Sequence, residues 1–208
     1  MKIILADYQK KVVEAWEAEF AGVSDIDVKY GSVFDVESDA LVSPANSFGF
    51  MDGGLDKSIS KFLGWHIQKR LQEIIRDKHH GELLVGEAEI IPTDSPTIPY
   101  IISAPTMRVP MLLEDTVNVY LATRAVLLLH KYGVFEDGLK IAEKIKTIVF
   151  PGMGTGVGMV QPVICARQMK RAVDEVFLNK YTFPKTWKEA EIRHRELFSY
   201  TREDLSKF

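Results

Sequence analysis

The sequence is organised around residues 40–57, which read Ala40-Leu41-Val42-Ser43-Pro44-Ala45-Asn46-Ser47-Phe48-Gly49-Phe50-Met51-Asp52-Gly53-Gly54-Leu55-Asp56-Lys57. The apolar start predicts a strand that stops at Pro44, because proline has no backbone N–H for a central strand. Residues 45–52 are therefore expected to form a loop at the carboxyl end of that strand. Gly53 and Gly54 allow the backbone to approach a ligand closely, and a helix predicted to begin near Leu55 points its first N–H groups the same way. This arrangement suits an anionic ligand.

Composition favours one α/β domain over two small ones, because 208 residues that are 46% hydrophobic can bury a sizeable core. A formal net charge of -3 argues against nonspecific binding of nucleic acid, which usually requires a strongly basic surface. The one cysteine, Cys165, cannot form an internal disulfide, and no Cys-x-x-Cys zinc spacing is present. The early Asp7 and the absence of an apolar run of about 18 residues argue against a signal peptide and a membrane span. We expect a cytoplasmic protein.

Strands and helices are predicted to alternate, which implies a sheet covered on both faces. The predicted strands are 3–6, 26–30, 40–43, 86–91, 99–105 and 147–151. The first predicted helix is capped by Asp7 and ends at Gly22. The other predicted helices span residues 55–63, 65–78, 114–132 and 162–178. From Asn179 the chain changes to an aromatic turn, followed by a charged helix over 188–198. We therefore expect a core over about 1–178 and a C-terminal extension over 179–208.

A second glycine-rich run directly follows the predicted strand 147–151, with Gly152, Gly154, Gly156 and Gly158 at every second position. Such a run can wrap a diphosphate with exposed backbone amides, or it can be a simple hairpin or packing loop. The first strand lacks G-x-G-x-x-G, and no G-x-x-x-x-G-K-[ST] occurs, so the Rossmann and P-loop folds are both excluded. A diphosphate site in this chain would therefore belong to another phosphate-binding fold.

Three segments, in this order along the chain, resemble the macro domain family, a module that binds ADP-ribose. Residues 31–46 are similar to the family's Gly-Asp-Ile-Thr…Asp-Ala-Ile-Val-Asn-Ala-Ala-Asn run. Residues 53–56 resemble its Gly-Gly-Val-Asp, and residues 150–158 resemble its Pro-Ala-Ile-Gly-Thr-Gly loop. The resemblance covers roughly residues 1–178. It implies an α/β fold with three α/β/α layers and a central mixed sheet.

The resemblance implies a role for each matching residue. Asn46 would hydrogen-bond the distal ribose, and Asp56 would orient or activate water near the anomeric carbon. The alternatives are that Asn46 caps a turn and that Asp56 is an acidic residue favoured by its helix dipole. No metal or organic cofactor is required. The implied ligand contacts are Ser32, Val33, Ala45, Phe48, Gly53, Gly54, Leu55, Gly152, Met153, Gly154, Thr155, Gly156, Val157 and Gly158, of which residues 154–156 would cradle the diphosphate.

The chain departs from the family pattern at two places. Ser32 stands where the family usually has the Asp that holds the adenine amino group, so this contact is in doubt or moves to a neighbour such as Asp35. The glycine run also lacks the family's usual aromatic residue, so either Phe48 or Phe50 would stack on the distal ribose, unless both belong to the core.

The implied activity is hydrolysis of ADP-ribosyl groups from modified proteins or of related ADP-ribose esters. The partner would be ADP-ribose or an ADP-ribosylated protein, with neither membrane nor nucleic acid involved. The alternatives are a non-catalytic ADP-ribose reader and an ADP-ribose 1″-phosphate phosphatase. Two other features are interpreted as structural: His79 and His80 as a solvated helix cap, and Cys165 as a buried thiol.

Overall fold

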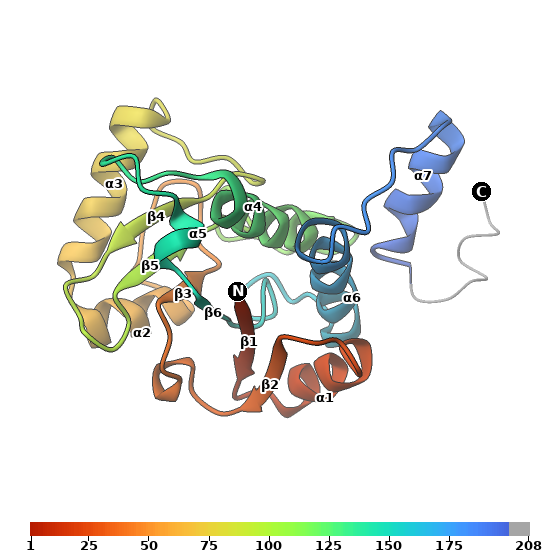
Figure 1. Cartoon of the computed structure of the whole chain (residues 1–208), viewed down its shortest axis with the longest axis horizontal. Helices are drawn as coiled ribbons and strands as arrows, with labels where there is room; N and C mark the ends of the chain where they lie inside the picture. Colours follow the sequence, from red (N-terminus) through yellow and green to blue (C-terminus); the bar gives the residue numbers. More distant parts are fainter. Residues whose placement is uncertain (200–208) are drawn as a thin grey trace.

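A six-stranded mixed sheet forms the centre of the computed structural model, which describes residues 1–199 (Figure 1). Residues 200–208 of the predicted extension lie outside the described residues. The sheet order is β2-β1-β6-β3-β5-β4, and β4 alone runs antiparallel to its neighbour. The strands are β1 (Lys2–Asp7), β2 (Ile26–Tyr30), β3 (Ala40–Ser43), β4 (Glu89–Pro92), β5 (Tyr100–Ser103) and β6 (Thr147–Phe150). The predicted mixed sheet is confirmed.

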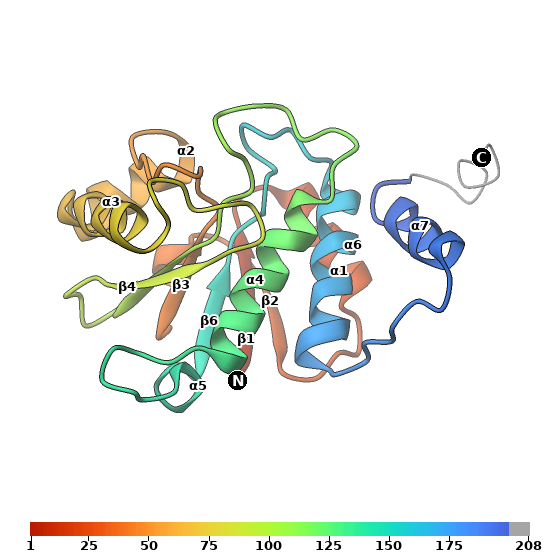
Figure 2. The same cartoon turned by 90° about the horizontal axis from the view of Figure 1, so that it is seen from above.

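Helices cover both faces of the sheet and complete the three predicted layers (Figures 1 and 2). Helices α2 and α3 lie on one face, and α1, α4 and α6 lie on the other. The helices are α1 (Lys10–Glu19), α2 (Gly54–Leu63), α3 (His66–Lys78), α4 (Asn118–Tyr132), the short α5 (Ile141–Lys144), α6 (Pro162–Ala172) and α7 (Trp187–Glu196). A 3-10 turn spans Val33–Asp35, and a π-helical turn over Val173–Phe177 continues α6.

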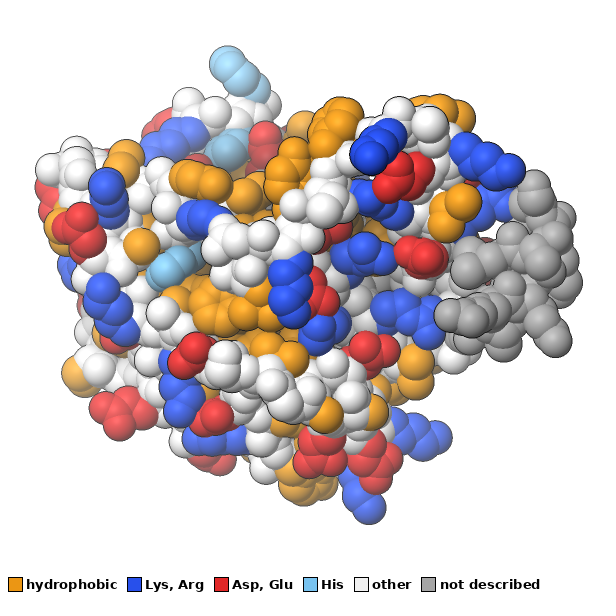
Figure 3. Space-filling view, turned by 45° about the vertical axis from the view of Figure 1, so that its right-hand side comes forward, with side chains coloured by type: hydrophobic (Ala, Val, Ile, Leu, Met, Phe, Trp, Pro, Cys, Tyr) orange, Lys and Arg blue, Asp and Glu red, His pale blue; other side chains and the backbone are white. Residues whose placement is uncertain are grey.

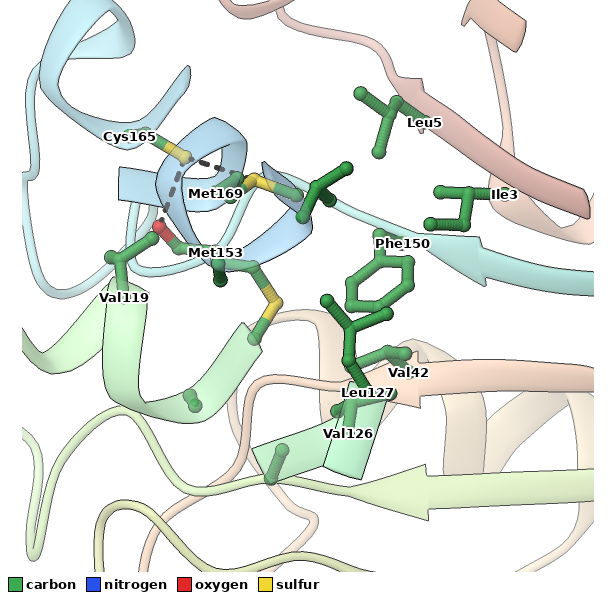
Figure 4. Packing of buried hydrophobic residues seen from close by; sticks show 14 of the residues in the cluster. Ile3, Leu5, Val42, Val119, Val126, Leu127, Phe150, Met153, Cys165 and Met169 are labelled. Atoms are coloured by element: carbon green, nitrogen blue, oxygen red, sulfur yellow. Dashed lines mark hydrogen bonds between the residues drawn. The ribbon is translucent and has the colours of Figure 1, made fainter. Parts of the chain in front are cut away.

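Alternating strand residues supply two separate hydrophobic cores. In β1, Ile3 and Leu5 pack with α1, α4 and α6, whereas Ile4 and Ala6 pack with α2 and α3. Figure 4 shows Ile3 and Leu5 near Phe150 of β6 on the first of these faces. Because both faces are covered, the inner parallel strands β1, β3, β5 and β6 are apolar over most of their length, as expected for a buried parallel sheet, whereas the edge strand β2 alternates apolar and polar residues.

The parallel strands place five loops at one edge of the sheet. The carboxyl ends of β1, β2, β3, β5 and β6 all point the same way, since these strands pair in parallel. Two of the loops that follow them, after β5 and β6, stand together at the top of Figure 2. Ligands of open α/β sheets bind at this edge.

Three predicted boundaries were wrong for local reasons. Asp7 is not a helix cap but the last residue of β1, and Gln9 is the N-cap of α1. β4 begins at Glu89 because residues 84–87 form a turn around Gly86, whose φ of 102° ends any strand there. Helix α4 begins at Asn118 because residues 114–117 form a loop in which Thr116 hydrogen-bonds back to Leu113.

The predicted C-terminal helix is α7, which stands away from the body of the molecule in Figures 1 and 2. Arg171 of α6 forms a 2.9 Å ion pair with Glu196 of α7, and Phe198 packs against the core. The aromatic turn that leads into α7 is exposed, with Phe183 at 77% and Trp187, the first residue of α7, at 85%. The division into a core over 1–178 and an extension over 179–208 stays a prediction.

The surface carries charges of both signs, and Figure 3 shows hydrophobic side chains gathered between Lys, Arg, Asp and Glu on one face. Among residues 1–199, no helix combines the length and the apolar character needed to cross a membrane.

Candidate functional site

The loops at the carboxyl edge of the sheet surround a cavity of about 590 Å³. This volume lies within the range of small-molecule sites, which is roughly 300–1,000 Å³. Every predicted site residue except Met153 lines it, namely Ser32, Val33, Ala45, Asn46, Phe48, Gly53, Gly54, Leu55, Asp56, Gly152, Gly154, Thr155, Gly156, Val157 and Gly158. The fold thus brings together three segments that are far apart in the sequence.

Met153 differs from the other predicted residues because its side chain belongs to the core. It is fully buried, and Figure 4 shows it extending away from the Gly loop toward α4. Its carbonyl accepts a 3.3 Å hydrogen bond from the Cys165 thiol. Burial raises the pKa of Cys165 to about 12, so the interpretation as a buried structural thiol is confirmed. The Met153 side chain therefore fixes the loop to the hydrophobic core and does not line the cavity.

The loop after β6 contains a run of backbone amides that form no intramolecular hydrogen bond of good geometry. Gly152 donates its N–H to Asp7 Oδ2 at 2.9 Å, and Met159 donates to Gly156 O at 3.0 Å. Between these two, no N–H from residue 153 to residue 158 donates to another described residue. Gly154 has a φ of 71°, which turns the backbone sharply within this segment. Runs of this kind are anion-binding sites in proteins.

Two of the 14 glycines have no steric reason to be glycine, and both line the cavity. Gly53 and Gly156 lack a positive φ, and a Cβ built on either would meet nothing within 4 Å. Each of the other glycines has a positive φ, close neighbours or both. Open space at Gly53 and Gly156 therefore indicates that the absent side chains leave room for a ligand.

Gly158 is different, because the close packing of the loop requires it. A Cβ at Gly158 would lie 2.6 Å from the backbone oxygen of Gly154 and 2.8 Å from Leu113 Cδ1. We expect Gly158→Ala to reduce the free energy of unfolding by about 1–3 kcal/mol, the range for overpacking. Denaturant unfolding measures this. A variant as stable as the parent would contradict the packing assigned to this loop.

Asp56 forms part of the cavity wall from the first turn of α2. It is 8% exposed, and the Ser43 hydroxyl of β3 donates a hydrogen bond to its Oδ1. Burial raises the pKa of Asp56 from 3.8 to about 6, and the Ser43 hydrogen bond opposes this increase only in part. Its Oδ2 has no hydrogen-bond partner among the described residues. The site therefore holds a carboxyl group that can exchange a proton near neutral pH.

Asn46 closes a tight turn within the loop after β3. Its Oδ1 accepts from the N–H groups of Phe48 at 3.1 Å and Phe50 at 3.3 Å, and its Nδ2 donates to Phe50 O at 2.8 Å. The turn-capping alternative is therefore present in the structure. An amide nitrogen carries two hydrogens, so one donor remains for a ligand.

The opposite end of the cavity lacks the acidic residue that the family pattern places there. The Ser32 hydroxyl accepts from Phe34 N at 3.1 Å. Asp35, the suggested substitute, is exposed and does not line the cavity. Asp7 does line it, but its two oxygens already accept from Gln9 N at 2.8 Å and Gly152 N at 2.9 Å.

Several lining residues were not predicted from the sequence. Among them are Asp7 at the end of β1, Tyr8 and Gln9 directly after it, and Thr106, Val109 and Pro110 after β5. Phe50 also lines the cavity and is 55% exposed, so it is not a core residue. The signal that could have identified the loops after β1 and β5 is their place directly after predicted parallel strands, whose carboxyl ends meet at one edge.

The cavity wall carries carboxylates but no cationic side chain. Asp7, Asp52 and Asp56 line it, whereas no Lys, Arg or His does. Elsewhere, His79 is the C-cap of α3 as predicted, but its side chain is not solvated, because it is only 17% exposed and its ring nitrogens lie 3.3 Å from Glu87 and 2.8 Å from Glu89; His80 is exposed. Within residues 1–199, no three His, Cys, Asp or Glu side chains are grouped so as to hold a metal ion.

The strand order and the glycine-lined cavity at the carboxyl edge of the sheet define an α/β protein with a candidate small-molecule site, and comparison with known proteins identifies its family. The chain belongs to the macro domain family, whose model matches residues 42–169. An uncharacterized protein of Aquifex aeolicus is 34% identical over 147 residues, covering 70% of this chain and 78% of that protein. One of Aeropyrum pernix is 32% identical over 145 residues, covering 70% and 68%.

Solved structures share the fold. The macrodomain of Mycobacterium tuberculosis DarG superposes with a TM-score of 0.57 at 15% identity, covering 71% of this chain and 88% of that one. The Oceanobacillus iheyensis macrodomain with ADP also gives 0.57, at 20% identity over 86% and 90% of the two chains. Thermosipho africanus DarTG in complex with ADP-ribose gives 0.55 at 19% identity, covering 70% of this chain and 37% of that one.

Proposed function

We propose that the cavity binds ADP-ribose and that the chain hydrolyses ADP-ribosyl groups from modified proteins or related ADP-ribose esters. The observation that carries this proposal is Asp56, a buried cavity-wall carboxyl with a pKa of about 6 and one oxygen open to a ligand or water. Structures of the same fold have been solved with ADP and with ADP-ribose, which supports the choice of ligand.

The order of strands supports one orientation of the ligand. β6 lies between β1 and β3, so the loop with the free amides at residues 153–158 is central. The loop after β3 and the helix that carries Asp56 lie on one side, and the loops after β1 and β2 lie on the other. With the diphosphate on the central amides, the distal ribose reaches Asn46 and Asp56, and the adenosine occupies the side of β1 and β2.

In the proposed reaction, Asp56 Oδ2 holds a water molecule against the anomeric carbon and accepts its proton. The water oxygen bonds to that carbon as the bond between the carbon and the side-chain oxygen of the modified residue breaks. A carboxylate leaving group departs with the bonding pair and needs no proton, so one carboxyl group is sufficient. At neutral pH most Asp56 is ionised, because its pKa is about 6, and it can accept the proton. Asn46 would hold the ribose hydroxyls in place during attack.

The direct experiment incubates the purified chain with a protein that is mono-ADP-ribosylated on acidic side chains and measures free ADP-ribose by chromatography. Release of ADP-ribose supports hydrolysis. Binding of ADP-ribose by calorimetry without release would instead assign a reader. Release of inorganic phosphate from ADP-ribose 1″-phosphate, with no action on the modified protein, would assign a phosphatase. The absence of binding at millimolar ADP-ribose would exclude all three activities.

The affinity for ADP-ribose should depend little on salt. The lining offers a diphosphate uncharged amides and three carboxylates, with no Lys or Arg. Raising NaCl from about 50 to 500 mM screens charge–charge attraction, so we expect the dissociation constant to change by less than about threefold. Calorimetry at the two salt concentrations tests this. A loss of about tenfold or more would mean that a cationic side chain from outside the lining contacts the phosphates.

A further inference from the structure

Gln9 occupies a position that local helix chemistry does not explain. It is the N-cap of α1, where Ser, Thr, Asp and Asn are preferred because their short side chains bond the first helical amides. The Gln9 side chain makes no such bond. Instead it reaches across the cavity edge to Thr155, a residue 146 positions away in sequence, and it lines the cavity beside Tyr8 and Ser32.

A chain of hydrogen bonds fixes which way the Gln9 carboxamide points. The Thr155 hydroxyl donates its single proton to Gly152 O at 3.2 Å. It can therefore only accept from Gln9, and Gln9 Nε2 donates to it at 3.2 Å. Gly152 is itself held by the bond from its N–H to Asp7 Oδ2. The amide nitrogen thus faces Thr155, and Oε1, which has no partner among the described residues, is left as a free acceptor.

We propose that Gln9 reads the nucleobase of the bound nucleotide and selects a purine that carries an amino group at position 6. The inference rests on the proposed function, because the order of strands places Gln9 on the side of β6 away from Asp56, where the adenosine would lie. In this proposal the loop after β1 recognises the amino group of the base, because Ser32 stands where the family has an Asp and has no carboxylate to accept from that group. The hydroxyl of Ser32 is a weaker acceptor and is already bonded to Phe34 N.

The chemistry of the two purines explains the selection. Adenine presents an amino donor at position 6 and an acceptor at N7, and a glutamine amide can match both with its oxygen and its second N–H. Hypoxanthine has a carbonyl at position 6, which would face Gln9 Oε1 acceptor to acceptor. Turning the amide over would relieve this clash but would break the bond to Thr155. Tyr8, which is 67% exposed and lines the same end, offers a ring on which either base can stack.

The test compares dissociation constants of ADP-ribose and its hypoxanthine analogue by calorimetry. The parent should bind ADP-ribose at least about fivefold more tightly, as one bidentate base contact is worth roughly 1–3 kcal/mol. In Gln9→Met, ADP-ribose should weaken and the two constants should agree within about twofold. Lys11→Met is the matched control, because Lys11 is exposed on the same helix, does not line the cavity and should keep the parent's ratio.

Two outcomes would overturn the inference while leaving the proposed function intact. One is a parent that binds both nucleotides equally, and the other is a Gln9→Met variant that keeps the parent's preference. Tyr8→Leu should weaken both nucleotides by the same factor, which separates stacking from reading of the base. If the parent binds neither nucleotide at millimolar concentration, the proposed function fails and this inference fails with it.

Discussion

Asp56→Asn should lower the rate of ADP-ribose release by about 10²–10⁴-fold, the usual contribution of a general base. The amide has almost the same shape as the carboxyl group, and its oxygen can still accept the hydrogen bond from Ser43. The cavity should therefore keep its shape, and the dissociation constant for ADP-ribose should change by less than about threefold. Single-turnover release and calorimetry on the same preparation measure the two effects.

The control is Asp35→Asn, the same substitution at an exposed carboxylate that does not line the cavity. It should match the parent in both measurements. If Asp56→Asn turned over substrate at the parental rate, the assignment of the proton acceptor would be wrong, even if binding remained.

The same substitution should change how stability depends on pH. Burial raises the pKa of Asp56 from 3.8 to about 6 in the folded protein. Well below pH 3.8 the group is protonated in both the folded and the unfolded protein, and its burial costs nothing. As pH rises from about 4 to about 6, the unfolded chain ionises while the folded protein keeps the proton, so the free energy of unfolding falls by about 3 kcal/mol in total and then stays constant above pH 6.

Asp56→Asn should not show this fall. Compared with the parent, its free energy of unfolding should therefore improve by about 2 kcal/mol between pH 4 and pH 7.5, as measured by urea denaturation at both values. Equal pH dependence in the two proteins would mean that Asp56 is not held in a poorly solvated position. We expect a buried carboxyl group that is retained for catalysis to lower the free energy of unfolding at neutral pH.

Gly156→Val should weaken ADP-ribose binding by about 100-fold or more while leaving the fold intact. A Cβ at Gly156 meets no protein atom within 4 Å, and Gly156 has no positive φ, so valine costs the folded chain little. Its branched side chain would project from the middle of the segment whose amides are free and would exclude a diphosphate from them. Calorimetry and thermal unfolding together test both halves of this expectation.

Gly158→Ala is the matched comparison, because it adds a smaller group two residues further along the same loop. There the Cβ would meet Gly154 O at 2.6 Å, so stability should fall. We expect the substitution at Gly156 to weaken the binding of ADP-ribose and the substitution at Gly158 to lower the free energy of unfolding. If Gly156→Val bound ADP-ribose as tightly as the parent, the free amides would not be the diphosphate site.

Much of the fold could be predicted from the sequence because local signals agreed with it. The apolar inner strands, the stop at Pro44 and the glycine pair at the start of α2 all act over a few residues, and each occurs where it was expected. The glycine run after β6 was identified for the same reason. α5 was missed because its four residues, Ile141–Lys144, are too few to show a helical period.

The rest of the site depends on contacts between distant parts of the chain. Asp7 looks like a helix cap in sequence, and only the packing of β1 against β6 brings it to Gly152 N. The pairing of β1 with β6 also brings Gln9 close enough for its side chain to donate a hydrogen bond to Thr155. Met153 lies within a motif of cavity residues, yet its side chain packs in the same core as Phe150, since Met153 is in a turn beyond the end of β6, where the alternation of strand side chains no longer applies.

A crystal structure of the chain with ADP-ribose tests the central claim most directly. We expect diphosphate oxygens within about 2.7–3.2 Å of several amide nitrogens between residues 153 and 158, the normal range for N–H···O hydrogen bonds. The anomeric carbon should lie beside Asp56, and the adenine should lie beside Gln9. A diphosphate held outside this loop, or a distal ribose at the end of the cavity near β1, would contradict the account.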